Sequence, residues 1–253
     1  MPRIFWYELK RLIFNRLFLA LITITAVYSY ITLTREIILG IAFTAPFSPW
    51  SYGAYLAKVQ PLLMITLLFF ITFMYSNHEK QVGQLTFATP VNPFKLGLVK
   101  VSAMSAGYFV ISLFILVLSM VFYAMLFRFY RFSDFILPII VILIPNLLFF
   151  LGAGLLLGGK NANTLYILMI ATLMLGFLPG ILPGIMPHPA FLGIQKFLDM
   201  YGSSLFSTYP LALPIGLDGE PLFSLPVSFI LGRIFFSTTG VLMALLGLKR
   251  YAK

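Results

Sequence analysis

The sequence predicts an all-α integral membrane protein with six transmembrane helices. Of its 253 residues, 60% are hydrophobic and only 9% are charged, whereas soluble domains carry about 25% charged residues. The mean hydropathy is +1.00, and Lys and Arg gather at the ends of long apolar segments. Because no stretch is polar enough to form a soluble core, we expect residues 1–253 to form a single membrane domain.

Six apolar segments have about the 20 residues that a helix needs to cross the hydrocarbon. The second segment is short, and we expect Lys58 and Gln60 to mark its outer edge. The segments are Leu17–Leu33, Gln60–Tyr75, Val101–Leu126, Phe135–Leu157, Thr164–Met186 and Pro226–Gly247.

The distribution of basic residues predicts that both termini are cytoplasmic. With the N-terminus inside, 11 Lys and Arg lie on the cytoplasmic side and 5 on the outer side, and Arg233 falls within the last segment. Cytoplasmic loops carry an excess of such residues. We therefore attribute the net charge of +10 to topology and anionic lipid headgroups. No nucleic acid is expected as a partner, because no basic face with stacking aromatic residues is visible.

Residues 1–16 predict an amphipathic helix that lies in the cytoplasmic interface. At about 100° per residue, Glu8, Arg11 and Asn15 share one face. The opposite face is apolar and comprises Phe5, Trp6, Leu9, Leu12 and Ile13. A plain positively charged flank before the first span is the alternative.

A polar, turn-rich segment at residues 76–94 separates the second and third apolar segments. Asn92 and Pro93 are typical of a helix start, with Asn as the cap and Pro at the first position. Pro90 ends whatever precedes it. This leaves residues 79–89 as a short separate helix, whose mixed polar and apolar surface suits a groove on a soluble partner. An ordinary capped loop is the alternative.

The region between the fifth and sixth apolar segments is apolar but rich in Pro and Gly. Irregular backbone at membrane depth needs protein or water to satisfy its polar groups. We therefore expect short re-entrant or interfacial helices on the outer face, within the extracellular segment 187–223.

Chemically active residues are scarce inside the six segments. Outside their ends the segments contain no Asp or Glu, and Arg233 is the only charged side chain within one. Arg233 either reaches the outer headgroups or helix-end carbonyls, or it contacts a substrate or a lipid phosphate. His78 and His188 are predicted on opposite faces of the membrane, and cysteine is absent. We therefore expect no metal site, no catalytic residues and no enzyme activity of the chain by itself.

The segment after the second span resembles the ABC-2 family of ABC-transporter permeases, in which a Glu, a Gly and a Pro-containing turn lead to a Lys at the start of the third span. The interfacial N-terminal helix resembles the family's elbow helix, and six spans with both ends inside also fit. The pattern that carries the resemblance is Glu79-x3-Gly83-x-Leu85-x4-Pro90-Val91-x-Pro93-x6-Lys100.

The resemblance implies a permease subunit that couples ATP hydrolysis by a separate ATPase chain to the movement of a substrate, with export as the expected direction. Segment 76–94 would act as a coupling helix that docks on the ATPase, where ATP and Mg are bound; this chain itself would bind no cofactor. The residues implied in ATPase coupling are Glu79, Gly83, Gln84, Leu85, Phe87, Pro90 and Pro93, and Glu8 and Arg11 of the elbow helix could touch the same partner.

The partners that the resemblance implies are two ABC ATPase subunits, a second permease subunit, same or different, and membrane lipid. The substrate would be amphipathic or lipid-like, such as an antimicrobial peptide, a lipid or a drug, and the location a bacterial plasma membrane. Two alternatives stay open: a substrate-binding membrane subunit of an importer, and a non-transporting assembly or scaffold subunit.

Overall fold

The computed structural model describes residues 2–34, 49–76, 79, 92–128, 130–185 and 227–251. All regular elements in these ranges are helical. They are α1 (Pro2–Ile13), α2 (Arg16–Thr32), α3 (Pro49–Met74), α5 (Pro93–Phe127), the short 3-10 helix η2 (Phe132–Phe135), α6 (Ile136–Gly158), α7 (Asn163–Ile185) and α9 (Val227–Tyr251).

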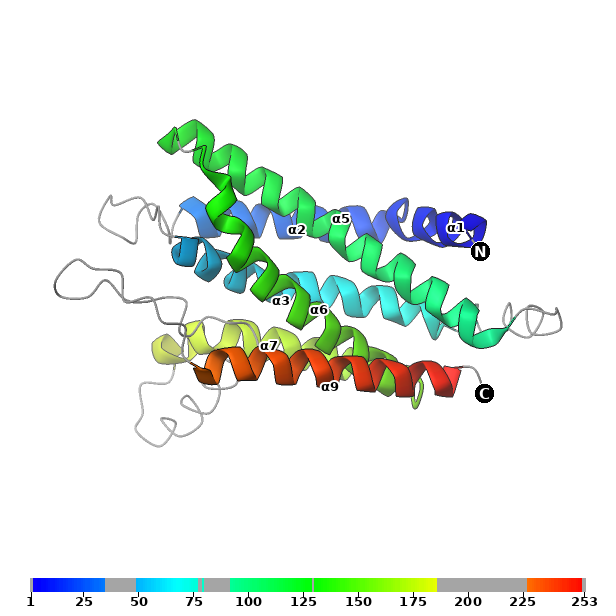
Figure 1. Cartoon of the computed structure of the whole chain (residues 1–253). Helices are drawn as coiled ribbons and strands as arrows, with labels where there is room; N and C mark the ends of the chain where they lie inside the picture. Colours follow the sequence, from blue (N-terminus) through cyan, green and yellow to red (C-terminus); the bar gives the residue numbers. More distant parts are fainter. Residues whose placement is uncertain are drawn as a thin grey trace.

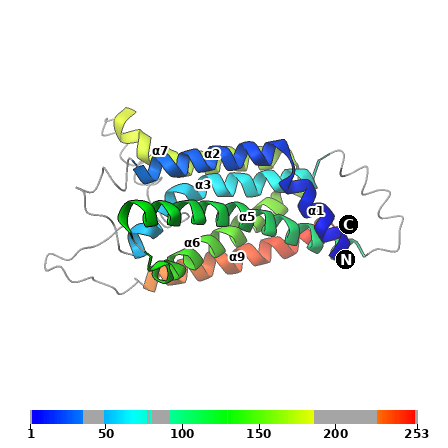
Figure 2. The same ribbon diagram turned by 90° about the horizontal axis from the view of Figure 1, so that it is seen from above.

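The long helices run in roughly one direction and form an elongated bundle (Figure 1). Both ends of the chain lie close together at one end of this bundle, which we call the terminal end (Figure 2). Basic residues near the chain ends and at nearby helix ends, such as Arg3, Lys95 and Arg250, belong to this end.

Each of the six apolar segments contains a helix in the structure, but not all of these helices qualify as spans by length and hydropathy. Four helical stretches do: Tyr55–Met74, Pro93–Leu126, Phe132–Gly158 and Leu231–Tyr251. Helix α2 qualifies only together with α1, across a bend of 61°, and α7 counts as a shorter apolar helix over Asn163–Met174. The chain is thus an all-helical protein of membrane type with four or five candidate spans in its described part.

Helix α3 is the centre of the bundle and packs against α2, α5, α6 and α7. Leu67, Leu68 and Phe70 are fully buried, as are other apolar residues of the surrounding core such as Ile111 and Leu155. Between membrane helices the hydrophobic effect contributes little, because lipid tails are as apolar as Leu, so close van der Waals packing holds such a core together.

Helix α3 begins eleven positions earlier than the sequence predicts, at Pro49 rather than Gln60. Gln60 therefore lies inside the helix, with no exposed surface. The second span therefore does not begin at Gln60, whose side chain is buried against α5 and donates a hydrogen bond from Nε2 to Tyr108. Pro61 follows within the helix, which membrane helices tolerate when neighbouring groups replace the missing N–H.

The outward faces of α2, α5, α7 and α9 carry large apolar side chains. Leu113, Ile167 and Leu242 expose more than 60% of their surface. Soluble monomers rarely expose contiguous apolar patches of more than a few hundred Å². These faces therefore fit contact with lipid.

Helices α6 and α9 approach each other more closely than ordinary side chains allow. A Cβ atom added to Gly152 of α6 would lie 2.0 Å from the carbonyl oxygen of Gly240 of α9. Gly154 of α6 is contacted by Ile71 and Leu68 of α3, and Gly158 by Tyr75, just after α3, and by Leu165 of α7. The small residues of α6 therefore serve internal packing.

Candidate functional site

Four charged side chains from three separate elements meet at the terminal end of the bundle. We call this group the ion cluster: Glu8 and Arg11 of α1, Glu79 from the segment after α3, and Lys100 of α5. Arg11 Nη1 lies 2.9 Å from Glu79 Oε2, and Arg11 Nη2 lies 3.0 Å from Glu8 Oε2. Lys100 Nζ donates a hydrogen bond to the other oxygen of Glu79. Glu79 thus joins α1 to α5 through both of its carboxylate oxygens.

The local sequence sets the position of each charge. Helix α5 starts where Asn92 accepts hydrogen bonds from the backbone N–H groups of Phe94 and Lys95, with Pro93 at its first position. The predicted helix start is therefore confirmed, and it places Lys100 two turns further on. On the other side, the backbone N–H of Glu79 donates to Ser76 Oγ at 3.3 Å, just after α3 ends.

The orientation of α1 differs in part from the one its sequence pattern indicates, because Glu8 is buried together with the apolar residues Leu9 and Leu12. The helix ends at Ile13, and Asn15 caps α2 instead of continuing the polar face. Glu8 is only 7% exposed, whereas Trp6 is 59% exposed. The sequence pattern misleads at Glu8 because this residue finds opposite charges inside the protein, in Arg11 and Lys100, and Arg11 in turn pairs with Glu79.

Burial and ion pairing have opposite effects on the pKa values of the two carboxylates in the ion cluster. Burial by itself raises the pKa of Glu79, but the hydrogen bond and the charge of Lys100, together with Arg11, outweigh it, so this pKa lies below its ordinary value of 4.5. For Glu8 burial is the largest influence and exceeds the attraction of Arg11 and Lys100, so its pKa lies above 4.5. Glu79 is therefore the firmly ionised carboxylate of the pair.

The C-terminal end of α9 also reaches the ion cluster. Lys100 Nζ lies 5.8 Å from the ring centroid of Tyr251, within cation–π range. The Tyr251 ring packs edge-on against Tyr75, whose hydroxyl donates to the carbonyl of Leu155 at 2.9 Å. Elements from both halves of the chain therefore meet around Lys100.

The predicted coupling residues have different outcomes. Glu79, Glu8, Arg11 and Pro93 are described, and the first three are brought together. Gly83, Gln84, Leu85, Phe87 and Pro90 lie outside the described residues, as does segment 187–223 with its expected re-entrant helices. The ATPase contact of Glu79 stays a prediction, and its described partners are Arg11 and Lys100 of the same chain.

Sequence reasoning placed Lys100 in the pattern that carries the resemblance but assigned it no partner, and it assigned no role to Tyr251. A signal for Lys100 is present, because a Lys at the start of a long apolar helix calls for a counter-ion. Tyr251 carries no such signal, since an aromatic residue near a chain end is common at membrane interfaces.

Arg233 lies in the first third of α9 and is buried, with 7% of its surface exposed. Its backbone carbonyl accepts a hydrogen bond from Ser237 Oγ at 2.8 Å. A contact of Arg233 with substrate or lipid stays a prediction.

A second polar region lies within the bundle, between α2, α3 and α5. Tyr52 shares a hydrogen bond of 2.8 Å with Ser119, and Gln60 Nε2 donates to Tyr108 at 3.2 Å. Tyr55 is hydrogen-bonded to Ser29. These uncharged pairs fix the register of three helices, and no carboxylate accompanies them among the described residues.

The described residues contain no group of three His, Asp or Glu side chains that could hold a metal ion. The chain matches no model of a known protein family, and comparisons with curated proteins and with solved structures find no match. The fold and the ion cluster thus define an all-helical membrane protein with a buried charge network at one end.

Proposed function

We propose that the protein is the membrane-spanning permease subunit of an ATP-driven transporter of the ABC-2 type. It would couple ATP hydrolysis by a separate ATPase chain to the movement, most simply the export, of an amphipathic or lipid-like substrate. The single observation that carries the proposal is the position of Glu79. This residue lies in the segment after α3 and is held by Arg11 of α1 and Lys100 of α5.

This arrangement supports a mechanical role for the segment that begins at Glu79. A force applied to the segment from the cytoplasm would reach α1 and α5 through the two ion pairs of the buried Glu79 carboxylate. Rigid-body movement of packed helices is a common switching mechanism in proteins. In this proposal Glu79 is the tether that transmits the force, and Leu85 and Phe87 supply the contact with the ATPase.

The division of roles between tether and contact residues gives a direct test. The tagged full chain is purified from native membranes in mild detergent, and the accompanying proteins are identified by mass spectrometry. We expect an ABC-type ATPase in near-equimolar amount. Leu85→Ala with Phe87→Ala should remove it, because these changes delete the docking surface. Glu79→Gln should retain the ATPase but abolish substrate-stimulated ATP hydrolysis.

Lys95→Gln is the matched control. Lys95 is exposed at the start of α5, so this substitution removes one charge without changing the ion cluster. Absence of any ATPase from the purified material would overturn the proposal. An ATPase that binds but is never stimulated, with any lipid or peptide, would favour the assembly or scaffold alternative.

A further inference from the structure

Helix α1 has a second face, which points away from the ion cluster and is exposed. Arg3, Tyr7, Lys10 and Phe14 follow one another at intervals of three or four residues, the spacing of a single helix face. Tyr7 is 66% exposed and Phe14, just after the helix, 82%. Such exposed aromatic residues on an otherwise well-packed helix call for a partner.

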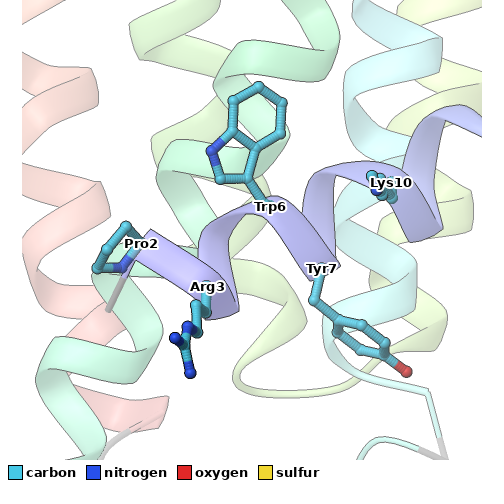
Figure 3. Close-up of a pocket in the computed structure, with 5 residues that line it drawn as sticks. All are labelled: Pro2, Arg3, Trp6, Tyr7 and Lys10. Atoms are coloured by element: carbon cyan, nitrogen blue, oxygen red, sulfur yellow. The ribbon is translucent and has the colours of Figure 1, made fainter.

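The exposed face of α1 is cationic, and no acidic side chain pairs with it among the described residues. Arg3 and Lys10 lie on it, and Arg16 follows the bend. The only acidic residue of the helix, Glu8, lies on the opposite face, where it pairs with Arg11. Figure 3 shows an open concavity lined by Pro2, Arg3, Trp6, Tyr7 and Lys10, with the Trp6 ring on one side of the helix and Arg3 and Tyr7 on the other.

The position of this face matches the level of lipid headgroups. Helix α1 leaves the direction of α2 by 61° at the terminal end, where the apolar spans finish. Beyond the bend the exposed surface becomes apolar, with Leu17 52% and Leu19 57% exposed on α2. Trp and Tyr beside basic residues are typical of the membrane–water interface. Charge and apolar surface therefore adjoin in the order in which a phospholipid presents its headgroup and its acyl chains.

We propose that Arg3, Trp6, Tyr7 and Lys10 bind the headgroup of an anionic phospholipid, whose acyl chains lie along Phe14 and Leu17. The two cationic side chains contact the phosphate, and the aromatic rings cover the glycerol region. A soluble phosphate or an acidic peptide would leave Phe14 and Leu17 in water, which favours lipid as the occupant. The site does not depend on the proposed transport function, since it uses only the face of α1 that the ion cluster leaves free.

The fluorescence of Trp6 can report its contact with lipid, because the chain has 2 Trp residues and the other, Trp50, can be replaced. The full-length Trp50→Phe variant is placed in phosphatidylcholine nanodiscs that contain a small fraction of brominated phosphatidylglycerol or brominated phosphatidylcholine. We expect brominated phosphatidylglycerol to quench Trp6 more strongly at equal fraction. The variant Arg3→Gln with Lys10→Gln should lower this preference by about fivefold for each charge removed.

The matched control is Lys249→Gln with Arg250→Gln, which removes the same charge from exposed positions at the same end of the bundle. It should keep the preference. Unchanged quenching of the Arg3 and Lys10 variant by brominated phosphatidylcholine verifies that α1 still lies in the interface. If Trp50→Phe does not fold, the native chain gives the same comparison at smaller amplitude.

Equal quenching by the two brominated lipids would overturn the proposal, as would an equal loss of preference in the control variant. Displacement by glycerol phosphate added in solution would also overturn it, because the site would then recognise a soluble phosphate rather than lipid.

Discussion

Glu79 forms ion pairs with two cations that lie far apart in the sequence, Arg11 and Lys100. Two buried charges in good geometry contribute little net stability compared with apolar residues, but removal of one partner leaves the other buried and uncompensated. The ion cluster therefore acts mainly by fixing which helices meet at the terminal end.

Replacement of Lys100 should be much more costly than replacement of its exposed neighbour Lys95. Lys100→Gln leaves the carboxylate of Glu79 with Arg11 alone, and we expect a loss of about 3 kcal/mol in unfolding free energy. Lys95→Gln should change it by less than about 0.5 kcal/mol. Thermal unfolding of both variants in the same detergent measures the difference, and similar midpoints would contradict the tethering role.

The two carboxylates of the ion cluster should give opposite pH effects. A lowered pKa means that ionised Glu79 stabilises the folded state above its ordinary pKa of 4.5, and this contribution is lost as the pH falls through the lowered pKa. A raised pKa means that Glu8 binds its proton more tightly in the folded state, so stability rises as the pH falls toward 4.5.

We therefore expect the unfolding temperature to peak at mildly acidic pH rather than at neutrality. Glu8→Gln should remove the rise between neutral pH and the peak, and Glu79→Gln should remove the fall on its acidic side. Unfolding curves recorded across this range test both statements. A peak that survives in both variants would assign the pH dependence to other groups.

At the scale of elements, the closest contact is between α6 and α9, where the backbones touch at Gly152 and Gly240. Helix α1 is packed differently, since one of its faces contributes to the ion cluster while the other is exposed.

A single added methyl group at the contact between α6 and α9 should force these two helices apart. In Gly240→Ala the new Cβ would lie 2.5 Å from backbone atoms of Leu148, and overpacking of this kind costs about 1–3 kcal/mol. Gly232→Ala, on the same helix, meets nothing within 4 Å and should be neutral or stabilise by up to about 1 kcal/mol. Unfolding of both variants in detergent gives the comparison, and equal stabilities would argue against the close approach.

At the scale of the whole molecule, periodicity and hydropathy predict the helices well, because lipid requires long uninterrupted apolar segments. The start of α5 was also predictable, since Asn92 and Pro93 carry local capping information. What the sequence could not show is contact between distant elements. The burial of Gln60 and the inward turn of Glu8 both depend on partners from other helices, and single-sequence patterns treat every polar residue as exposed.

The orientation of the bundle in the membrane remains a prediction from the basic residues, and the absence of cysteine allows a clean test. Lys249→Cys, at the terminal end, should react with an impermeant maleimide only after the cells are opened. Arg131→Cys, just before η2, should react in intact cells. These positions are exposed, so reactivity reports sidedness rather than burial. The reverse pattern would place the termini outside.

The start of α1 and the end of α9 lie at the same end of the bundle, where Figure 2 marks the two ends of the chain. Two copies of the gene can therefore be joined in one reading frame by a short hydrophilic linker that never has to cross the bilayer. Such a tandem chain fixes the stoichiometry of a pair, and it allows one half to carry a substitution while the other keeps the native residue. A tandem chain with Glu79→Gln in one half can then be expressed in cells to test whether one intact ion cluster is sufficient for the function of the pair.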